Sequence, residues 1–381
     1  MSSQKTLLYN CLFVIWLVIC PVTSNSSQES APPANITTAW QRIGVFEEPG
    51  VTHYQSGWLT AGVEVTIIER NRIGDWVHIY RASVDGGVFV DGWVMTGFLN
   101  LDDNLKFSEV PINPNIVDGN PEFLPSLDMQ RLATIPILPE IHESIRDVYH
   151  HGQELGNESH VVTKIGDSLC AADSFLVVYN AEDYELGPYD YLEESVIYYR
   201  DSLSESVAAR AGMATYTIFD PMWADNELCE VGEAPIYCEY RLKQPSIVFI
   251  MFGPNDIRHT TGDKYETQIR QIIEETLELG IIPVLSTFSA HPENEFWPHS
   301  IQFNNILVDI AEEYNIPIIN LWLAARGLPG YGMDTDQVHM LLSGFDYVIF
   351  SSGHESRYGA SLQNLLLMNM LHELRLFLDI D

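Results

Sequence analysis

The run from Ile247 to Phe252 is entirely apolar, and it constrains the fold more than any other stretch of this 381-residue chain. A strand with one face in water alternates apolar and polar residues, so an uninterrupted run predicts a strand covered on both faces. Beyond residue 160, further runs predict strands near 161–166, 213–218, 246–252, 281–286 and 316–321, separated by helical patterns at 264–279, 300–314 and 360–378. This alternation predicts an α/β domain with a parallel sheet and helices on both faces.

Three polar motifs lie at or beyond the carboxyl ends of these strands, where sheets of this kind hold their reactive residues. The motif GDSL (166–169) follows the first strand, GPND (253–256) follows the third, and DQVH (336–339) lies beyond the last. Their order supplies a nucleophile, oxyanion donors and a base with its orienter, which acyl transfer to water requires.

Ser168 is the candidate nucleophile, because its place between a strand and a helix can direct its hydroxyl to the loop side of the sheet. Gly166 permits the tight turn, and Asp167 can hydrogen-bond within it. Helix capping is the alternative explanation for this motif.

Asn255 is a candidate oxyanion donor through its side-chain amide, and Gly253 gives the backbone the freedom to place it. A simple turn is the alternative, since Gly, Pro, Asn and Asp all form turns.

His339 can accept the proton of Ser168, and Asp336 can orient the imidazole, with Asp334 as a rival orienter. A surface histidine or a metal pair is the alternative. No His-x-x-x-His or Cys-x-x-Cys spacing and no Gly-rich phosphate loop occurs, so neither a metal nor a cofactor is predicted.

Taken together, the motifs resemble those of the SGNH, or GDSL-type, hydrolase family over roughly residues 160–378. The resemblance implies a flavodoxin-like α/β domain and a catalytic triad of Ser168, His339 and Asp336. It also implies an oxyanion hole formed by Ser168, Asn255 and Gly212, the glycine of Arg-Ala-Gly at 210–212. The chain departs from the family pattern in its long segment between Ser168 and Asn255.

The activity that this resemblance implies is that of a serine esterase without a cofactor. Its substrate would be an acylated carbohydrate or a short-chain ester. Two alternatives remain open: a glycan-binding protein with a silent hydrolase fold, and an acyltransferase whose acceptor is not water.

The first 24 residues predict an export signal, because the nearly apolar stretch from Leu7 to Cys20 follows Lys5 and precedes Ser/Thr-rich sequence. The stretch is shorter than the roughly 20 residues of a spanning helix, so a cut after Ser24 leaves a mature chain without a membrane span. A secreted, cell-surface or periplasmic location follows. A retained anchor and a lipid-modified Cys20 are the alternatives.

Three cysteines remain in the mature chain. Cys229 and Cys238 flank a short loop and predict a disulfide in an oxidising compartment, worth about 2–3 kcal/mol by the chain-entropy argument. Cys170 is left over and is expected to be a small buried filler.

The remaining segments suggest a modular chain. Residues 25–37 predict a disordered spacer, 38–101 a small β-barrel, 102–159 a proline-rich linker and 160–381 the hydrolase domain. Within the barrel, GDWVHI (74–79) and GWV (92–94) resemble a bacterial Src-homology-3-like domain. That resemblance implies contact with cell-wall glycans or peptides, and a structural appendage without a ligand is the alternative.

Acidic residues dominate the charge. The chain has 53 acidic and 19 basic residues, a formal net charge of −34. Such a surface repels phosphate backbones and lacks polybasic clusters, so nucleic-acid partners and anionic membrane surfaces are not expected.

Overall fold

Strand β9 (Pro245–Met251) is buried along its whole length, inside a parallel sheet of order β11-β10-β9-β8. Its neighbours are β8 (Glu158–Gly166) and β10 (Ile282–Ser286), with β11 (Ile318–Ile319) at the far edge. Successive strand residues point to opposite faces, so burial of every residue of β9 and β10 means that both faces are covered. The predicted α/β class with a parallel sheet is therefore confirmed.

The computed structural model describes the chain from residue 34 onward, and the predicted export signal lies outside the described residues. Those residues are 34–37, 43–49, 54–60, 62–71, 76–81, 90–101, 105, 109–116, 126–180, 184–344, 347–352 and 354–380. Among them, no helix combines the length and the apolar character that crossing a membrane requires.

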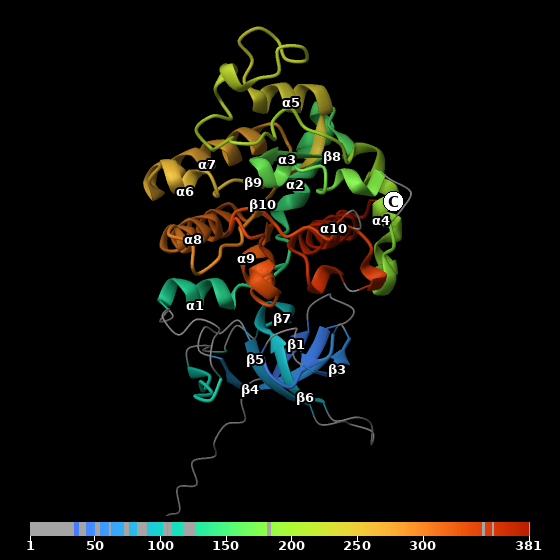
Figure 1. Ribbon diagram of the computed structural model, residues 1–381. Coiled ribbons are helices and arrows are strands. Elements are labelled where there is room, and N and C mark those ends of the chain that lie inside the picture. Colours follow the sequence, from blue (N-terminus) through green and yellow to red (C-terminus); the bar gives the residue numbers. More distant parts are fainter. Residues whose placement is uncertain are drawn as a thin grey trace, which may run out of the picture. The chain divides into compact units, whose positions relative to one another are not determined.

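Helices cover the sheet on two sides (Figure 1). Because parallel strands joined in sequence have right-handed crossovers, α7 and α8 share one face, where they contact each other, while α10 contacts α4 on the other side. The α-helices are α1 (Leu127–Thr134), α2 (Ser144–Leu155), α3 (Ser168–Ala171), α4 (Glu193–Tyr199), α5 (Pro235–Lys243), α6 (Asp256–His259), α7 (Gly262–Glu278), α8 (Trp297–Tyr314), α9 (Leu321–Arg326) and α10 (Gly359–Phe377).

The strand predicted at 213–218 is wrong, because the chain turns there instead. The Thr217 hydroxyl accepts a hydrogen bond from the Ala214 amide and donates to the Ala214 carbonyl, while the Thr215 amide bonds to the side chain of Asp256. The hydroxyl of Thr217 and the carboxyl group of Asp256 thus replace the ladder partners that a strand would need.

The N-terminal part is a small all-β domain, an antiparallel sheet of order β3-β2-β6-β5-β4-β1-β7. Valine and isoleucine side chains at alternate positions of its strands are buried, as in Val65 and Ile67. The strands are β1 (Ala34–Thr37), β2 (Ile43–Phe46), β3 (Gln55–Leu59), β4 (Glu64–Arg70), β5 (Trp76–Arg81), β6 (Val90–Met95) and β7 (Leu99–Asn100).

Strand β1 corrects the spacer predicted over 25–37, since the last four of those residues pair with β4 and β7. The Ser/Asn/Pro-rich composition concealed a short strand whose pairing comes from distant residues.

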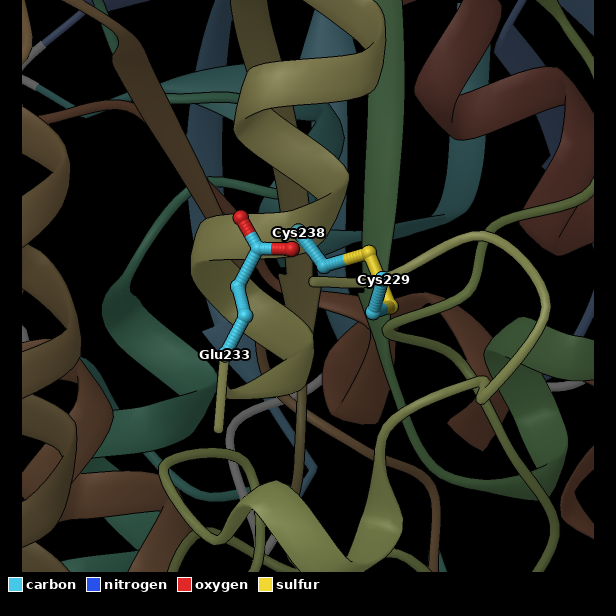
Figure 2. A group of neighbouring side chains, drawn as sticks. All are labelled: Cys229, Glu233 and Cys238. Carbon is cyan, nitrogen blue, oxygen red and sulfur yellow. A yellow bond between two sulfur atoms is a disulfide. The ribbon is translucent and has the colours of Figure 1, made fainter. Parts of the chain in front are cut away.

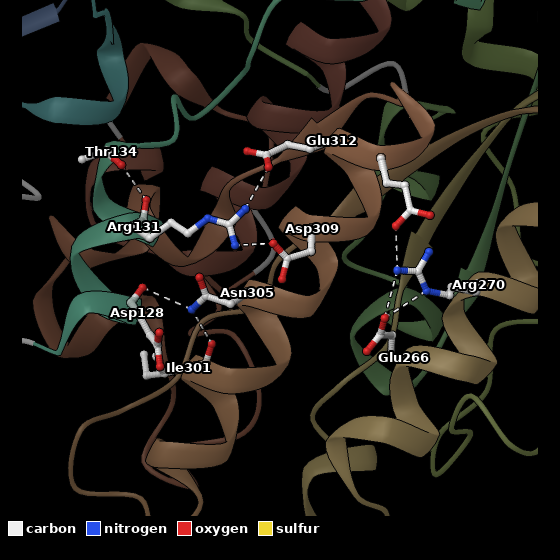
Figure 3. Close-up of polar contacts among 10 residues, drawn as sticks. Asp128, Arg131, Thr134, Glu266, Arg270, Ile301, Asn305, Asp309 and Glu312 are labelled. Carbon is white, nitrogen blue, oxygen red and sulfur yellow. Dashed lines mark hydrogen bonds and ion pairs between the residues drawn. The ribbon is translucent and has the colours of Figure 1, made fainter. Parts of the chain in front are cut away.

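The predicted linker over 102–159 is also wrong in its second half, which folds onto the α/β domain. Arg131 of α1 pairs with Asp309 and, at 2.8 Å, with Glu312 of α8 (Figure 3). The buried side chain of Asn320 donates to the carbonyls of Leu132 and Ile135 at 2.8 and 3.0 Å. Prolines break this segment into short pieces, but they do not keep those pieces from packing.

The predicted disulfide joins Cys229 to Cys238 (Figure 2). It ties the loop before helix α5 to that helix. Cys170 is buried, as expected of a filler.

Packing of α1 predicts that Leu132→Ala destabilises the protein by about 2–5 kcal/mol, because the side chain is fully buried. Its neighbour Arg131 makes only exposed ion pairs, so Arg131→Ala should cost about 1 kcal/mol or less. Urea unfolding of both variants checks this. Unfolding midpoints equal to that of the parent in both would mean that α1 is not part of the folding unit.

Candidate active site

The turn that presents Ser168 depends on the close approach of β8 and β9. Gly166 has φ +157°, and a Cβ atom added to it would lie 2.3 Å from the carbonyl oxygen of Met251 and 2.7 Å from Cys170 Sγ. Only glycine fits there. Asp167 then caps helix α3 by accepting the Leu169 amide at 2.9 Å, which leaves Ser168 as the first helical residue.

Ser168, His339 and Asp336 meet although 171 residues separate the first two. Ser168 Oγ lies 3.0 Å from His339 Nε2, and His339 Nδ1 lies 2.6 Å from Asp336 Oδ2. Both distances are those of hydrogen bonds. The structure thus brings together the nucleophile, base and orienter that the sequence predicted. The side chains of His339 and Asp336 are about half exposed, at 50% and 49%, so solvent reaches the site.

Asp336, and not Asp334, orients the histidine. Asp336 Oδ1 also accepts the amides of Val338 and His339, both at 2.9 Å. Burial by itself would raise the pKa of Asp336, but the hydrogen bonds from His339 and Val338 outweigh it and lower the pKa to about 2. Asp334 Oδ1 bonds instead to the amide and hydroxyl of Thr335. An ionised Asp336 fixes the tautomer that leaves Nε2 free to take a proton.

The predicted oxyanion donors lie on segments that are hydrogen-bonded to one another. The amide of Arg210 donates to the Gly166 carbonyl, which ties the stretch leading to Gly212 to the nucleophile turn. Asn255 Nδ2 donates to the carbonyl of Met213 at 2.9 Å, which ties the Asn255 turn to the same stretch. One N–H of the Asn255 amide remains for an oxyanion.

Gly253 sets the approach of the Asn255 turn. It has φ +145°, and an added Cβ atom would lie 2.1 Å from the ring of Phe288. Any side chain at this position would displace the turn. The sequence suggested that Gly253 provides backbone freedom, and the structure shows that it is also required for close packing.

Asp256, the last residue of the GPND motif, is a feature that the sequence did not single out. Its side chain is fully buried, and Oδ1 accepts the amide and the hydroxyl of Thr215 at 3.0 and 2.6 Å. Burial raises its pKa to about 6. The sequence showed that Asp256 belongs to the motif. It did not show its partner Thr215, which lies in a segment that was expected to be a strand.

Asp167 is a second fully buried carboxyl group behind the nucleophile. Burial raises its pKa to about 7, opposed by the Leu169 amide and reinforced by the charge of Asp256. Neither Oδ2 of Asp167 nor Oδ2 of Asp256 has a hydrogen-bond partner within the described residues. Burial favours the protonated form of both carboxyl groups.

Two cavities flank these loops. One of about 280 Å³ is bordered by Ser168, His339 and Asp336. The other, of about 20 Å³, lies between Pro254 and Val338, the neighbours of Asn255 and His339. The smaller one has room for a group the size of a water molecule or a methyl.

A second serine–histidine pair exists, but it lacks the orienter. Ser195 Oγ lies 3.0 Å from His372 Nδ1 and accepts a hydrogen bond from Arg375. Burial and the charge of Arg375 lower the pKa of His372. Ser195 is fully buried, and within the described residues no carboxylate bonds to this imidazole, so the pair has a packing role.

The described residues contain one group of three side chains close enough to share a metal ion, Cys229, Glu233 and Cys238 (Figure 2). Both sulfurs are joined in the disulfide, and Glu233 pairs with Arg241 at 2.8 Å. The donor set therefore does not fit a metal.

The parallel sheet, the serine at its loop edge and the facing histidine define an ester hydrolase of the serine type. The model of the GDSL-like lipase/acylhydrolase family matches residues 165–345. This part of the chain is similar to the members of that family. No curated protein gives a match.

Solved structures that are similar to the chain include three esterases. The psychrotrophic esterase EstA from Pseudoalteromonas sp. is 17% identical, with 58% of this chain and 100% of that chain covered and a TM-score of 0.36. A GDSL-like lipase from Bacteroides thetaiotaomicron is 13% identical, with 60% and 99% covered and a TM-score of 0.37. The acetylxylan esterase Axe2 from Geobacillus stearothermophilus is 16% identical, with 60% and 97% covered and a TM-score of 0.36.

The buried pair predicts how stability depends on pH. Because burial raises the pKa of Asp167 to about 7, the folded protein keeps a proton that the unfolded chain releases near about pH 4. The contribution of Asp167 to the free energy of unfolding therefore falls as the pH rises from about 4 to about 7 and is steady above that. Asp167→Asn does not titrate, so its stability relative to the parent should increase by on the order of 2–4 kcal/mol over this window.

Urea unfolding at several pH values between about 4 and about 8 measures this difference. The exposed Asp201 supplies the control, since Asp201→Asn should follow the parent at every pH. A pH-independent difference for Asp167→Asn would show that Asp167 does not hold the proton.

Proposed function

We propose that the protein is an exported esterase in which Ser168 attacks an ester or O-acetyl carbonyl. The observation that supports this most directly is the chain of two hydrogen bonds, 3.0 Å from Ser168 to His339 and 2.6 Å from His339 to Asp336. Such a connection argues against a silent hydrolase fold, because nothing in it separates the hydroxyl from its base.

In the first half of the reaction His339 Nε2 takes the proton of Ser168 as Oγ bonds to the carbonyl carbon. The oxygen that becomes negative is held by the amides of Ser168 and Gly212 and by the side chain of Asn255. The amide of Ser168 suits this task because the first N–H groups of a helix have no partner within it. His339 then gives the proton to the alcohol oxygen as the bond from carbon to that oxygen breaks.

In the second half a water molecule loses a proton to His339 and attacks the acyl-enzyme, which releases the acid and restores Ser168. The half-exposed side chain of His339 gives water access to this step. Asp336 remains ionised throughout and stabilises the imidazolium.

A short acyl group is part of the proposal, with the small cavity beside Pro254 and Val338 as the space that would receive it. The cavity between the Asn255 and His339 loops has a volume of only about 20 Å³. An acylated carbohydrate or a short-chain ester is the proposed substrate class, and no cofactor enters the scheme.

Export is part of the proposal, and it is supported by the disulfide between Cys229 and Cys238, since such bonds persist in oxidising compartments. The N-terminal all-β domain is proposed to contact wall glycan. The net charge of −34 disfavours nucleic-acid partners.

Removal of the nucleophile tests the proposal. Ser168→Ala should abolish turnover of p-nitrophenyl acetate and labelling by a fluorophosphonate, because both require the hydroxyl. Ser195→Ala is the matched control, since Ser195 also bonds to a histidine but is buried, and it should keep both properties. Circular dichroism confirms that each variant folds. Full turnover in Ser168→Ala would refute the mechanism.

Removal of the orienter distinguishes the two aspartates of the histidine loop. Asp336→Asn should lower kcat by about 10⁴, because an amide favours the wrong imidazole tautomer. Steady-state kinetics on p-nitrophenyl acetate measure the loss. A loss of that size in Asp334→Asn, with Asp336→Asn much less affected, would make Asp334 the orienter instead.

A further inference from the structure

The cavity of about 280 Å³ beside Ser168 is bordered by polar side chains that retain unused hydrogen-bonding atoms. Gln363 of α10 is 5% exposed and borders this cavity. Its Nε2 makes a single contact, 3.4 Å from the sulfur of Met251, and its Oε1 accepts no hydrogen bond from the described residues. A buried amide normally has its hydrogen bonds satisfied, so this one is available to a ligand.

Ser174 and Asp334 add two further groups. Ser174 is 7% exposed, and its hydroxyl makes no hydrogen bond within the part of the chain that the structure describes. Asp334 stands at the exposed side of the cavity with Oδ1 engaged by Thr335 and Oδ2 unbonded there. Three polar side chains from separate segments therefore offer unused hydrogen-bonding atoms to one space.

Apart from the three triad residues, the rest of the wall is apolar, with Leu169, Phe175 and Met340 among its members. An alkyl chain could lie against these side chains. It would, however, remove water from Gln363 and Ser174 without forming hydrogen bonds to them. A site with unpaired buried polar groups rejects such a ligand strongly. A compact ring with apolar C–H faces and hydroxyl groups at its edge matches both parts of the wall.

The cavity lies on the side of the departing alcohol. His339, which must protonate the leaving oxygen, borders it, whereas Gly212 and Asn255, the proposed oxyanion donors, do not. Its volume is close to the lower limit of small-molecule sites, about 300 Å³. The space suits one ring of the alcohol portion.

We propose that Gln363 and Ser174, assisted by Asp334, select esters of polyhydroxylated alcohols of the size of one sugar ring. This inference rests on the proposed function and specifies the leaving group that the same site accepts. Gln363 and Ser174 act as specificity residues by hydrogen-bonding hydroxyl groups next to the ester oxygen.

The test compares two esters of equal ring size, methyl O-acetyl-β-D-glucopyranoside and cyclohexyl acetate. The wild-type protein should favour the sugar ester in kcat/KM by about tenfold or more. Gln363→Leu should lower this ratio by about tenfold, chiefly through KM for the sugar ester, and Ser174→Ala should lower it in the same direction. Gln302→Leu, which removes an exposed glutamine of α8, should keep the wild-type ratio.

A binding measurement keeps the inference separate from catalysis. Calorimetric titration of Ser168→Ala with the sugar ester should give a dissociation constant that Gln363→Leu, in the same background, weakens by about tenfold. Preference for cyclohexyl acetate, or sugar-ester binding that Gln363→Leu leaves intact, overturns the selection. Fluorophosphonate labelling of Ser168 with no preference for the sugar ester would refute the selection alone. Absence of labelling would refute the proposed function, and the titration would still decide the selection.

Discussion

The ends of β8 and β9 approach so closely that a single added methyl group would collide with backbone. The candidate site depends on this constraint. Gly166 allows the carbonyl of Met251 to sit where a side chain would otherwise be, and Gly253 allows the ring of Phe288 to do the same one strand away. Because both turns lie close to the sheet, Ser168 and the Asn255 amide follow the carboxyl ends of two adjacent strands. Parallel pairing of the strands aligns the two turns, and the absence of side chains at Gly166 and Gly253 lets them approach closely.

Three aspartates of the motifs differ in protonation because their environments differ. Asp336 is half exposed and accepts hydrogen bonds from an imidazole and two amides, so it is held as an anion. Asp167 and Asp256 are fully buried with one oxygen each unpaired, so they favour the protonated form. Negative charge is thereby kept beside the histidine and limited beneath the serine, where it would oppose a developing oxyanion.

Much of the site could be predicted from the sequence, because its residues are fixed by short turns after recognisable strands. Ser168 and Asn255 follow that rule, while His339 was found by its spacing from Asp336 beyond the last strand. The segments that were mispredicted depend on partners far along the chain. The turn at residues 213–218 is held by a hydrogen bond from Thr215 to Asp256, and α1 packs because of Asn320 and α8. Gln363 lies in an ordinary apolar helix pattern, and only the fold reveals that its Oε1 accepts no hydrogen bond from the described residues.

The base and its orienter belong to a single turn. Asp336 bonds to the amides and the imidazole that follow it, and the amide of Asp334 donates to the carbonyl of His339 at 2.8 Å, so six consecutive residues organise this half of the triad. The conformation of one surface segment therefore decides whether Ser168 has a histidine partner. The sheet beneath this segment can stay folded in either case. Heating should abolish activity by opening this segment before the core unfolds, and cooling should restore the activity. The resistance of the activity to heat is then set by one loop rather than by the whole fold.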